Sequence, residues 1–203
     1  MPRLSTLIDD FAERFSFENT KLSSLARVMR EAGLLTSGAR GVNAPMATPL
    51  DAARLVIAMM LDSKLPNVVE DVHLVGRFVI VDRSKWTPTF QPETLEQGLA
   101  ELFKYVGTAS EDALADFAFA FTLTPYAAIG TIEFARIPEE GEEKRTELAF
   151  SHPDMADTTA GKPLPESYLE VARRFPLGFY QRPMLLTGGI LGVGTLVMDE
   201  TIK

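Results

Sequence analysis

Residues 117–123 alternate strictly between large apolar and small side chains, and this run constrains the fold more than any other part of the chain. The large members are Phe117, Phe119, Phe121 and Leu123, and the small ones are Ala118, Ala120 and Thr122. Such a period of two places the large side chains on one face of a strand. Residues 127–136 and 145–150 favour two further strands, joined by a charged turn at 138–143. The sequence therefore predicts a small antiparallel meander in the second half.

The first third of the chain has helical periodicity instead, with apolar residues recurring every three or four positions. The expected helices span residues 5–15, 20–33, 48–62 and 67–75. Thr20 is the predicted N-cap of the second helix, and Gly33 suits a left-handed position after its end. The strongest start signal belongs to the third helix, where Thr48 precedes Pro49 and Asp51 as in a capping box.

The remaining segments are less regular. Residues 92–105 and 165–175 predict amphipathic helices. Residues 78–81 favour a short buried strand over the end of the preceding helix, and residues 152–165 favour a long loop. Residues 184–198 fit either a packed helix or a glycine-interrupted strand, and propensity does not decide between them.

Together these patterns predict an α+β fold with two parts. A helical, helix-turn-helix-like module is expected over residues 1–75, followed over residues 76–203 by helices around the antiparallel meander. Hydrophobic residues make up 46% of the chain, which is enough for a core without disulfides. We find no signal-peptide pattern, and the longest apolar run, at 184–198, is too short to cross a bilayer. The expected location is the cytoplasm of a host cell.

Enzyme signals are weak, so we predict a protein that is not an enzyme and uses no cofactor. The chain has no cysteine and only two histidines. His73 is expected to be a packed or half-exposed helix residue, and His152 with Asp154 supplies too few ligands for a structural metal site. A nuclease-like set can be assembled from Asp116, Glu142 and Lys144. Glu142 belongs to the predicted turn and Lys144 follows it directly, which favours a solvated charge run over a Mg²⁺ site.

Charge is distributed unevenly along the chain, and this motivates a DNA-binding hypothesis. The formal net charge is -8, yet acidic and basic residues are nearly balanced before residue 65, so the acidity lies in the second half. We predict contacts with double-stranded DNA from Lys21, Arg27, Arg30, Arg40, Asn43 and Arg54. A plain helical packing module is the alternative, because a helix-turn-helix has a turn of about 3–4 residues and this connection is longer.

Aromatic residues near prolines suggest a second kind of contact. The predicted partner-binding residues are Trp86, Phe90, Phe179 and Tyr180. Exposed aromatic side chains of this kind anchor protein interfaces, although they can equally cap a core. Gly188 and Gly192 permit close approach of another backbone, either within the chain or in a homo-oligomer.

The N-terminal third resembles a segment of uncharacterised proteins encoded by prophages. The resemblance covers residues 25–35, the loop Gly-Ala-Arg-Gly-Val-Asn-Ala-Pro at 38–45, and the Thr-Pro-capped helix from Thr48 to Leu61. It implies a mobile-element setting and carries no activity or metal site.

Two functional hypotheses follow from these observations. In the first, a phage or mobile-element protein binds DNA through its N-terminal helices, and a host or phage protein through its acidic second half, as a packaging adaptor or regulator. The alternative is a factor that acts through protein contacts alone. It would inhibit a host defence complex that binds nucleic acid, or form part of a virion, because an acidic surface can occupy a site built for phosphates.

Overall fold

Helices and one antiparallel sheet make up the described part of the chain, so the predicted α+β class is confirmed. A computed structural model describes residues 2–38, 46–87, 90–136, 144–156, 164–175 and 184–198. The helices are α1 (Leu4–Arg14), α2 (Asn19–Glu31), α3 (Pro49–Met60), α4 (Val68–Gly76), α5 (Leu95–Thr108), α6 (Glu111–Leu114), α7 (Pro153–Ala156), α8 (Glu166–Arg174) and α9 (Thr187–Met198), with 3-10 turns η2 (Arg83–Lys85) and η3 (Pro125–Ala127). The strands are β1 (Val79–Ile80), β2 (Phe117–Thr124), β3 (Ile129–Arg136), β4 (Lys144–Ser151) and β5 (Met184–Leu186).

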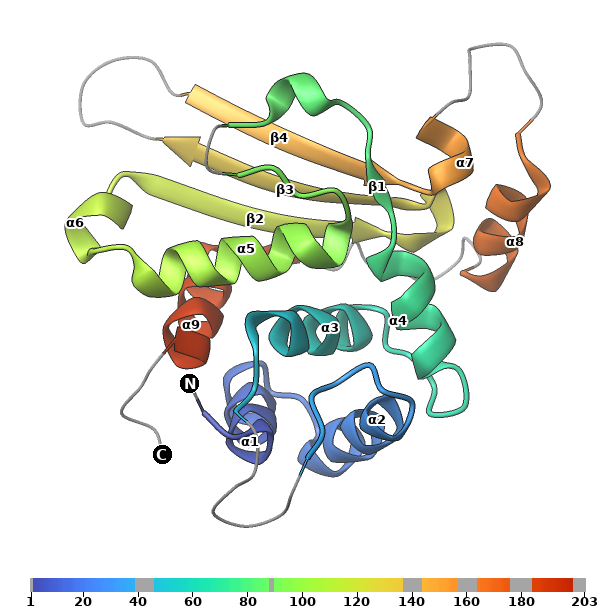
Figure 1. Cartoon of the computed structure of the whole chain (residues 1–203), viewed down its shortest axis with the longest axis horizontal. Helices are drawn as coiled ribbons and strands as arrows, with labels where there is room; N and C mark the ends of the chain where they lie inside the picture. Colours follow the sequence, from blue (N-terminus) through green and yellow to red (C-terminus); the bar gives the residue numbers. More distant parts are fainter. Residues whose placement is uncertain are drawn as a thin grey trace.

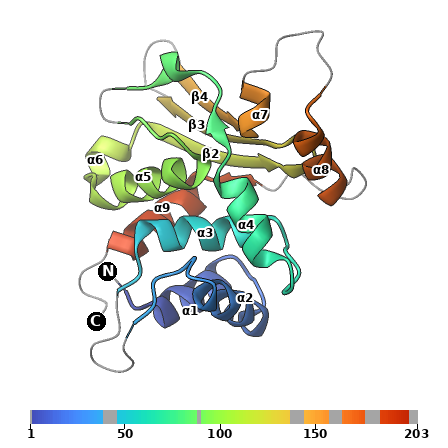
Figure 2. The ribbon, with the colours of Figure 1, turned by 45° about the vertical axis from the view of Figure 1, so that its right-hand side comes forward.

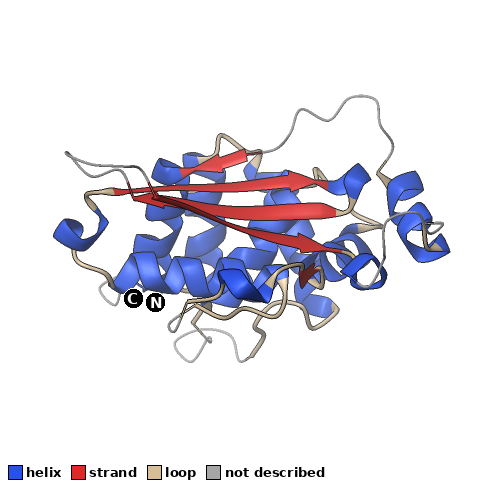
Figure 3. Ribbon diagram, turned by 90° about the horizontal axis from the view of Figure 1, so that it is seen from above, coloured by secondary structure: helices blue, strands red, loops and turns tan. Residues whose placement is uncertain are grey.

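The elements are stacked in layers beneath the sheet. Figure 1 shows the sheet uppermost, α5 and α9 below it, then α3 with α4, and finally α1 with α2. The same order is visible after the turn in Figure 2, and the view from above in Figure 3 places the strands over the helices. In this stack α1 and α2 lie farthest from the sheet, with α3, α4, α5 and α9 between them and the long strands.

The sheet has the strand order β1-β4-β3-β2-β5, and all its pairings are antiparallel. The predicted strand is present as β2, and Phe119, Phe121 and Leu123 are buried as expected for one face, although Thr122 of the other face is buried as well. The register pairs Phe121 with Ile132, so these side chains lie on the same face of the sheet. Helix α5 packs directly on that face: a Cβ added at Gly98 would lie 2.9 Å from the Ile132 side chain.

Two helix starts are set by capping boxes. At α3, the side chain of Thr48 accepts a hydrogen bond from the backbone N–H of Asp51. The Asp51 carboxylate accepts one from the backbone N–H of Thr48, as the sequence predicted. At α5, the equivalent pair is Thr94 with Gln97, so this helix begins later than the predicted residue 92. The predicted N-cap at Thr20 is wrong, because α2 already begins at Asn19 and has no side-chain cap.

Three further expectations are settled by the fold. Gly33 has a φ of 77°, which confirms the left-handed position after α2. The predicted strand at 78–81 is present as β1. The predicted loop at 152–165 is wrong at its start, where Pro153–Ala156 form a short helix, and residues 157–163 lie outside the described part.

The C-terminal segment contains both of the structures that its sequence left open. Met184–Leu186 add to β2 as β5, and Thr187–Met198 continue as α9. Helix α9 crosses α5 at a pair of glycines, since a Cβ added at Gly107 would lie 2.1 Å from the carbonyl oxygen of Gly194. The close approach is made at Gly194, whereas the sequence prediction named Gly188 and Gly192.

One hydrophobic cluster contains buried side chains from α1 to α4 as well as from the sheet and α9. Ion pairs also join the two predicted modules, whose predicted boundary is residue 75: Arg174 of α8 binds Asp71 and Glu70 of α4. Folding of residues 1–75 as a separate module stays a prediction. No helix in the described ranges combines the length and the apolar run that crossing a bilayer requires.

Candidate functional site

One candidate site is an open pocket between α5 and the neighbouring face of β2 and β3. It has a volume of about 620 Å³, which is the size of a typical ligand site. Its lining residues are Thr87, Phe90, Glu101, Leu102, Lys104, Tyr105, Thr108, Phe117, Phe119 and Phe134. Aromatic rings therefore form much of its wall.

Strand register brings the rings of this pocket together. Alternation along β2 turns Phe117 and Phe119 to the same side, where their rings stack with centroids 6.0 Å apart. Phe134 is the partner of Phe119 across the hairpin. The ring of Phe90 meets that of Phe134 edge to face at 5.8 Å. Two backbone hydrogen bonds between Thr87 and Phe90, of 3.2 and 3.3 Å, hold Phe90 in this position.

The opposite wall is a polar stripe of α5, formed by residues three and four positions apart. Glu101 is half-buried, whereas Lys104 and Tyr105 are exposed, Tyr105 at 46%. Burial raises the pKa of the Glu101 carboxyl group, and a hydrogen bond from the backbone of Gln91 and the charge of Lys104 oppose that shift in part. The pocket thus offers apolar surface next to one partly desolvated carboxylate, which is suited to binding.

Of the four aromatic residues predicted to bind a partner, one lines the pocket, one is half-buried nearby in the chain, and two lie outside the described residues. Phe90 lines the pocket. Trp86 is half-buried and lies beside the guanidinium of Arg83, with 5.4 Å between the guanidinium carbon and the ring centroid. The indole N–H of Trp86 is buried without a hydrogen-bond partner in the described structure. Phe179 and Tyr180 lie outside the described residues.

Two of the predicted DNA-binding residues form a small basic surface on α2. Arg27 and Arg30 are exposed and lie one turn apart. Together with Leu4 and Ile8 of α1 they line a pocket of about 110 Å³. Neither arginine has an ion-pair partner within the described ranges, so both guanidinium groups can meet a ligand.

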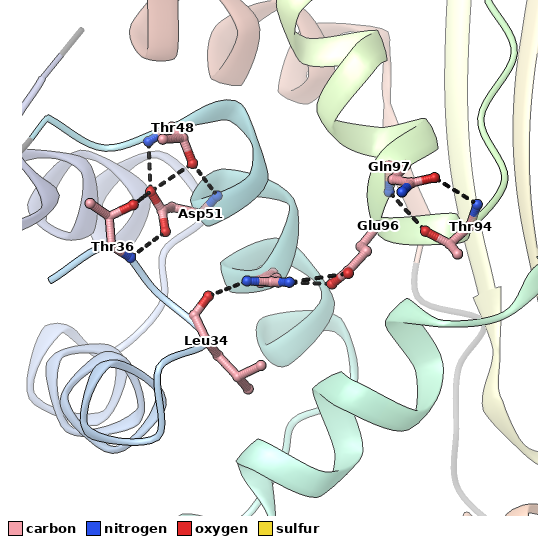
Figure 4. Close-up of polar contacts among 8 residues, drawn as sticks. Leu34, Thr36, Thr48, Asp51, Thr94, Glu96 and Gln97 are labelled. Carbon is pink, nitrogen blue, oxygen red and sulfur yellow. Dashed lines mark hydrogen bonds and ion pairs between the residues drawn. The ribbon is translucent and has the colours of Figure 1, made fainter.

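The other predicted basic residues are not part of this surface. Lys21 forms an ion pair with Asp62, and its ammonium group lies 5.2 Å from the centroid of the Phe17 ring. Arg54 points into the protein and is bound on two sides, as the contacts at Glu96 and Leu34 show in Figure 4.

Arg54 has the geometry of an internal connection between helices. Its Nε and Nη2 donate to the two carboxylate oxygens of Glu96 at 2.8 and 3.1 Å, and its Nη1 donates to the Leu34 carbonyl at 2.5 Å. The side chains of Arg54 and Glu96 are 19% and 16% exposed. We therefore leave Arg54 out of the basic surface and assign it to the packing of α3 on α5.

Arg40 and Asn43 lie outside the described residues, but the segments on both sides of them are held in place. Before them, Thr36 donates to the Asp51 carboxylate from its backbone N–H and from its hydroxyl, each at 2.7 Å. After them, the N–H of Ala47 donates to the carbonyl of Pro2 at 2.9 Å. The chain thus leaves and re-enters the described structure beside the start of α3.

The residues considered for catalysis do not assemble into a described site. His152 is nearly buried beside Phe78 and accepts a hydrogen bond at Nδ1 from the backbone N–H of Asp154 at 3.3 Å. Asp116 pairs with Arg136 at 3.6 Å. His73 is exposed on α4, so the expectation of a packed or half-exposed residue is wrong. Lys144 opens β4, and Glu142 lies outside the described residues. Within the described ranges, no three histidines or acids are grouped to hold a metal.

The sequence reasoning missed the helix side of the aromatic pocket. Glu101 and Tyr105 are four positions apart on a helix that was predicted, and so lie on one face. Whether they lie close to Phe134 depends on the register between β2 and β3. The sequence pattern does not determine that register when the length of the turn is unknown. Comparison of the chain with known protein families, curated proteins and solved structures found no match.

Proposed function

We propose that this chain is a non-enzymatic interaction protein of a phage or mobile element, and that it holds a protein partner in the pocket between α5 and the sheet. The open aromatic wall of that pocket carries the proposal. Partly accessible phenylalanine rings release water when a partner covers them, and concave binding sites are lined mainly by such apolar and aromatic side chains. The mobile-element setting rests on the prophage resemblance of the N-terminal third.

Protein binding at this pocket is common to both functional hypotheses. A packaging adaptor or regulator would use it to join DNA to a second protein. An inhibitor of a host defence complex, or a virion component, would use the pocket without binding DNA. The acidity of the second half supports a basic partner surface in either case, since complementary charge speeds association and excludes other partners.

Site-specific crosslinking tests the proposal in host cells that produce the full chain. We expect a photoreactive benzoylphenylalanine at Tyr105, on the rim of the pocket, to capture one discrete protein. The same group at Tyr126, in η3 at the other end of β2, is the matched position. Phe90→Ala should lower capture at Tyr105 by about tenfold or more, because it removes one ring of the wall.

The control for Phe90→Ala is Phe17→Ala, which removes a half-buried ring of the N-terminal part. Thermal melting should show that both variants remain folded. Equal capture at Tyr105 and Tyr126, or capture at Tyr105 that Phe90→Ala leaves unchanged, would contradict partner binding at this pocket.

DNA binding by the N-terminal helices is the second candidate function. Its support is the pair of exposed guanidinium groups of Arg27 and Arg30. In fluorescence anisotropy with a DNA duplex, Arg27→Ala/Arg30→Ala should weaken binding and reduce the slope of log affinity against log salt by about 2, since each arginine would neutralise one phosphate. Arg83→Ala/Arg173→Ala, in the second half, is the control. Absence of binding by the intact chain at low salt would reject this function.

A further inference from the structure

We infer that the pocket between α5 and the sheet takes an arginine side chain of the partner, with its guanidinium at Glu101 and its stem along the phenylalanine rings. The inference rests on the proposed function and adds the chemical class of group that the pocket selects. Glu101 thereby becomes the residue that determines specificity.

The composition of the wall favours a cation with an apolar stem. The faces of aromatic rings attract cations, and the attraction increases where water is excluded. Phe90, Phe117 and Phe134 are half-buried in this wall. An arginine side chain matches it well, because its methylene groups pack on apolar surface and its planar guanidinium stacks on rings and binds a carboxylate through two hydrogen bonds.

The charge within the pocket favours the same occupant. Glu101 is the acidic residue among the described lining residues, and it belongs to no ion pair within that part of the chain. Its raised pKa reflects a cost of desolvation that the charge of a bound cation would offset. An anionic ligand would instead be repelled there.

Among the lining residues that the structure describes, Lys104 is the one whose charge opposes an incoming cation. It lies three positions after Glu101 on α5 and is exposed. Because its long side chain can turn towards water, it weakens the attraction of Glu101 without abolishing it. Removal of the Lys104 charge should therefore raise the affinity for a cation, whereas removal of the Glu101 charge should lower it.

Two probes of equal shape separate the effect of charge from that of the pocket. We would titrate the full chain with benzylguanidine and with its neutral analogue benzylurea, following backbone amide resonances by NMR. Both probes should shift resonances of α5 and β2, and benzylguanidine should bind about fivefold more tightly, as expected for one partly exposed charge pair.

Three variants assign that preference to its source. Glu101→Gln should abolish the preference for the cation, and Lys104→Gln should increase it. Glu13→Gln, which removes an exposed carboxylate of α1, should leave it unchanged. Should Glu101→Gln fail to fold, the increase with Lys104→Gln still decides the question.

The outcomes separate this inference from the function on which it rests. Equal binding of both probes to the wild-type chain, with shifts in α5 and β2, would overturn arginine selection and leave the pocket as a binding site. A cation preference that survives Glu101→Gln would also overturn it. If neither probe shifts these resonances, the proposed function fails together with the inference.

Discussion

Replacing Asp51 with alanine is expected to lower the free energy of unfolding by about 3 kcal/mol or more. Asp51 is 2% exposed. It accepts hydrogen bonds from the N–H and hydroxyl of Thr36, both at 2.7 Å, and from the N–H and hydroxyl of Thr48, at 2.6 and 2.8 Å. Figure 4 shows these three residues around the start of α3. Without the carboxylate, the helix loses its cap and several donors remain buried without an acceptor.

Urea unfolding followed by circular dichroism measures this loss, provided that the slope with denaturant is unchanged. The matched control is Thr94→Ala, which removes the more exposed capping box of α5 and should cost about 1 kcal/mol. Asp51→Asn should fall between the two, since it keeps the shape and loses the charge. A cost for Asp51→Ala no greater than that for Thr94→Ala would contradict the role of this carboxylate in joining the end of α2 to α3.

Gly107→Ala is expected to destabilise the fold by about 3 kcal/mol, which is large for the addition of one methyl group. Its Cβ would lie 2.1 Å from the carbonyl oxygen of Gly194 and 2.6 Å from the Met198 side chain. Backbone cannot move aside as a flexible side chain can, so α5 and α9 would have to separate. Denaturant unfolding measures the effect.

Gly33→Ala is the control for this prediction. No atom lies within 4 Å of the added methyl group at Gly33, but its φ is 77°, which should cost about 1 kcal/mol through backbone strain alone. A Gly107→Ala chain as stable as the wild type would show that α9 does not cross α5 at these glycines.

The parts of the fold that the sequence predicted depend on local patterns. Alternation in 117–123 identified β2, and the order Thr48, Pro49, Asp51 identified the start of α3, because both signals act within a few residues. The secondary structure of residues 184–198 could not be assigned from the sequence. A strand followed by a helix, both made of glycines and apolar residues, shows no single hydrophobic period. Its structure depends on packing against β2 and α5.

The candidate site was harder to predict because its members meet only in the folded chain. Phe90 was identified as an exposed aromatic residue, but its neighbour Phe134 comes from β3 and Glu101 from α5. Arg54 was predicted to meet phosphates, and no local feature indicated that Glu96, far along the chain, would bind it. Arg27 and Arg30, which stay exposed, needed no such long-range information.

The central claim is that this chain binds its partner in the pocket between α5 and the sheet, and intermolecular NOEs from benzylurea test it most directly. We predict NOEs from the benzyl protons of the probe to the rings of Phe117, Phe119 and Phe134. NOEs confined to Leu4 and Ile8 in the small α1–α2 pocket, or no NOEs to the chain at all, would contradict the claim.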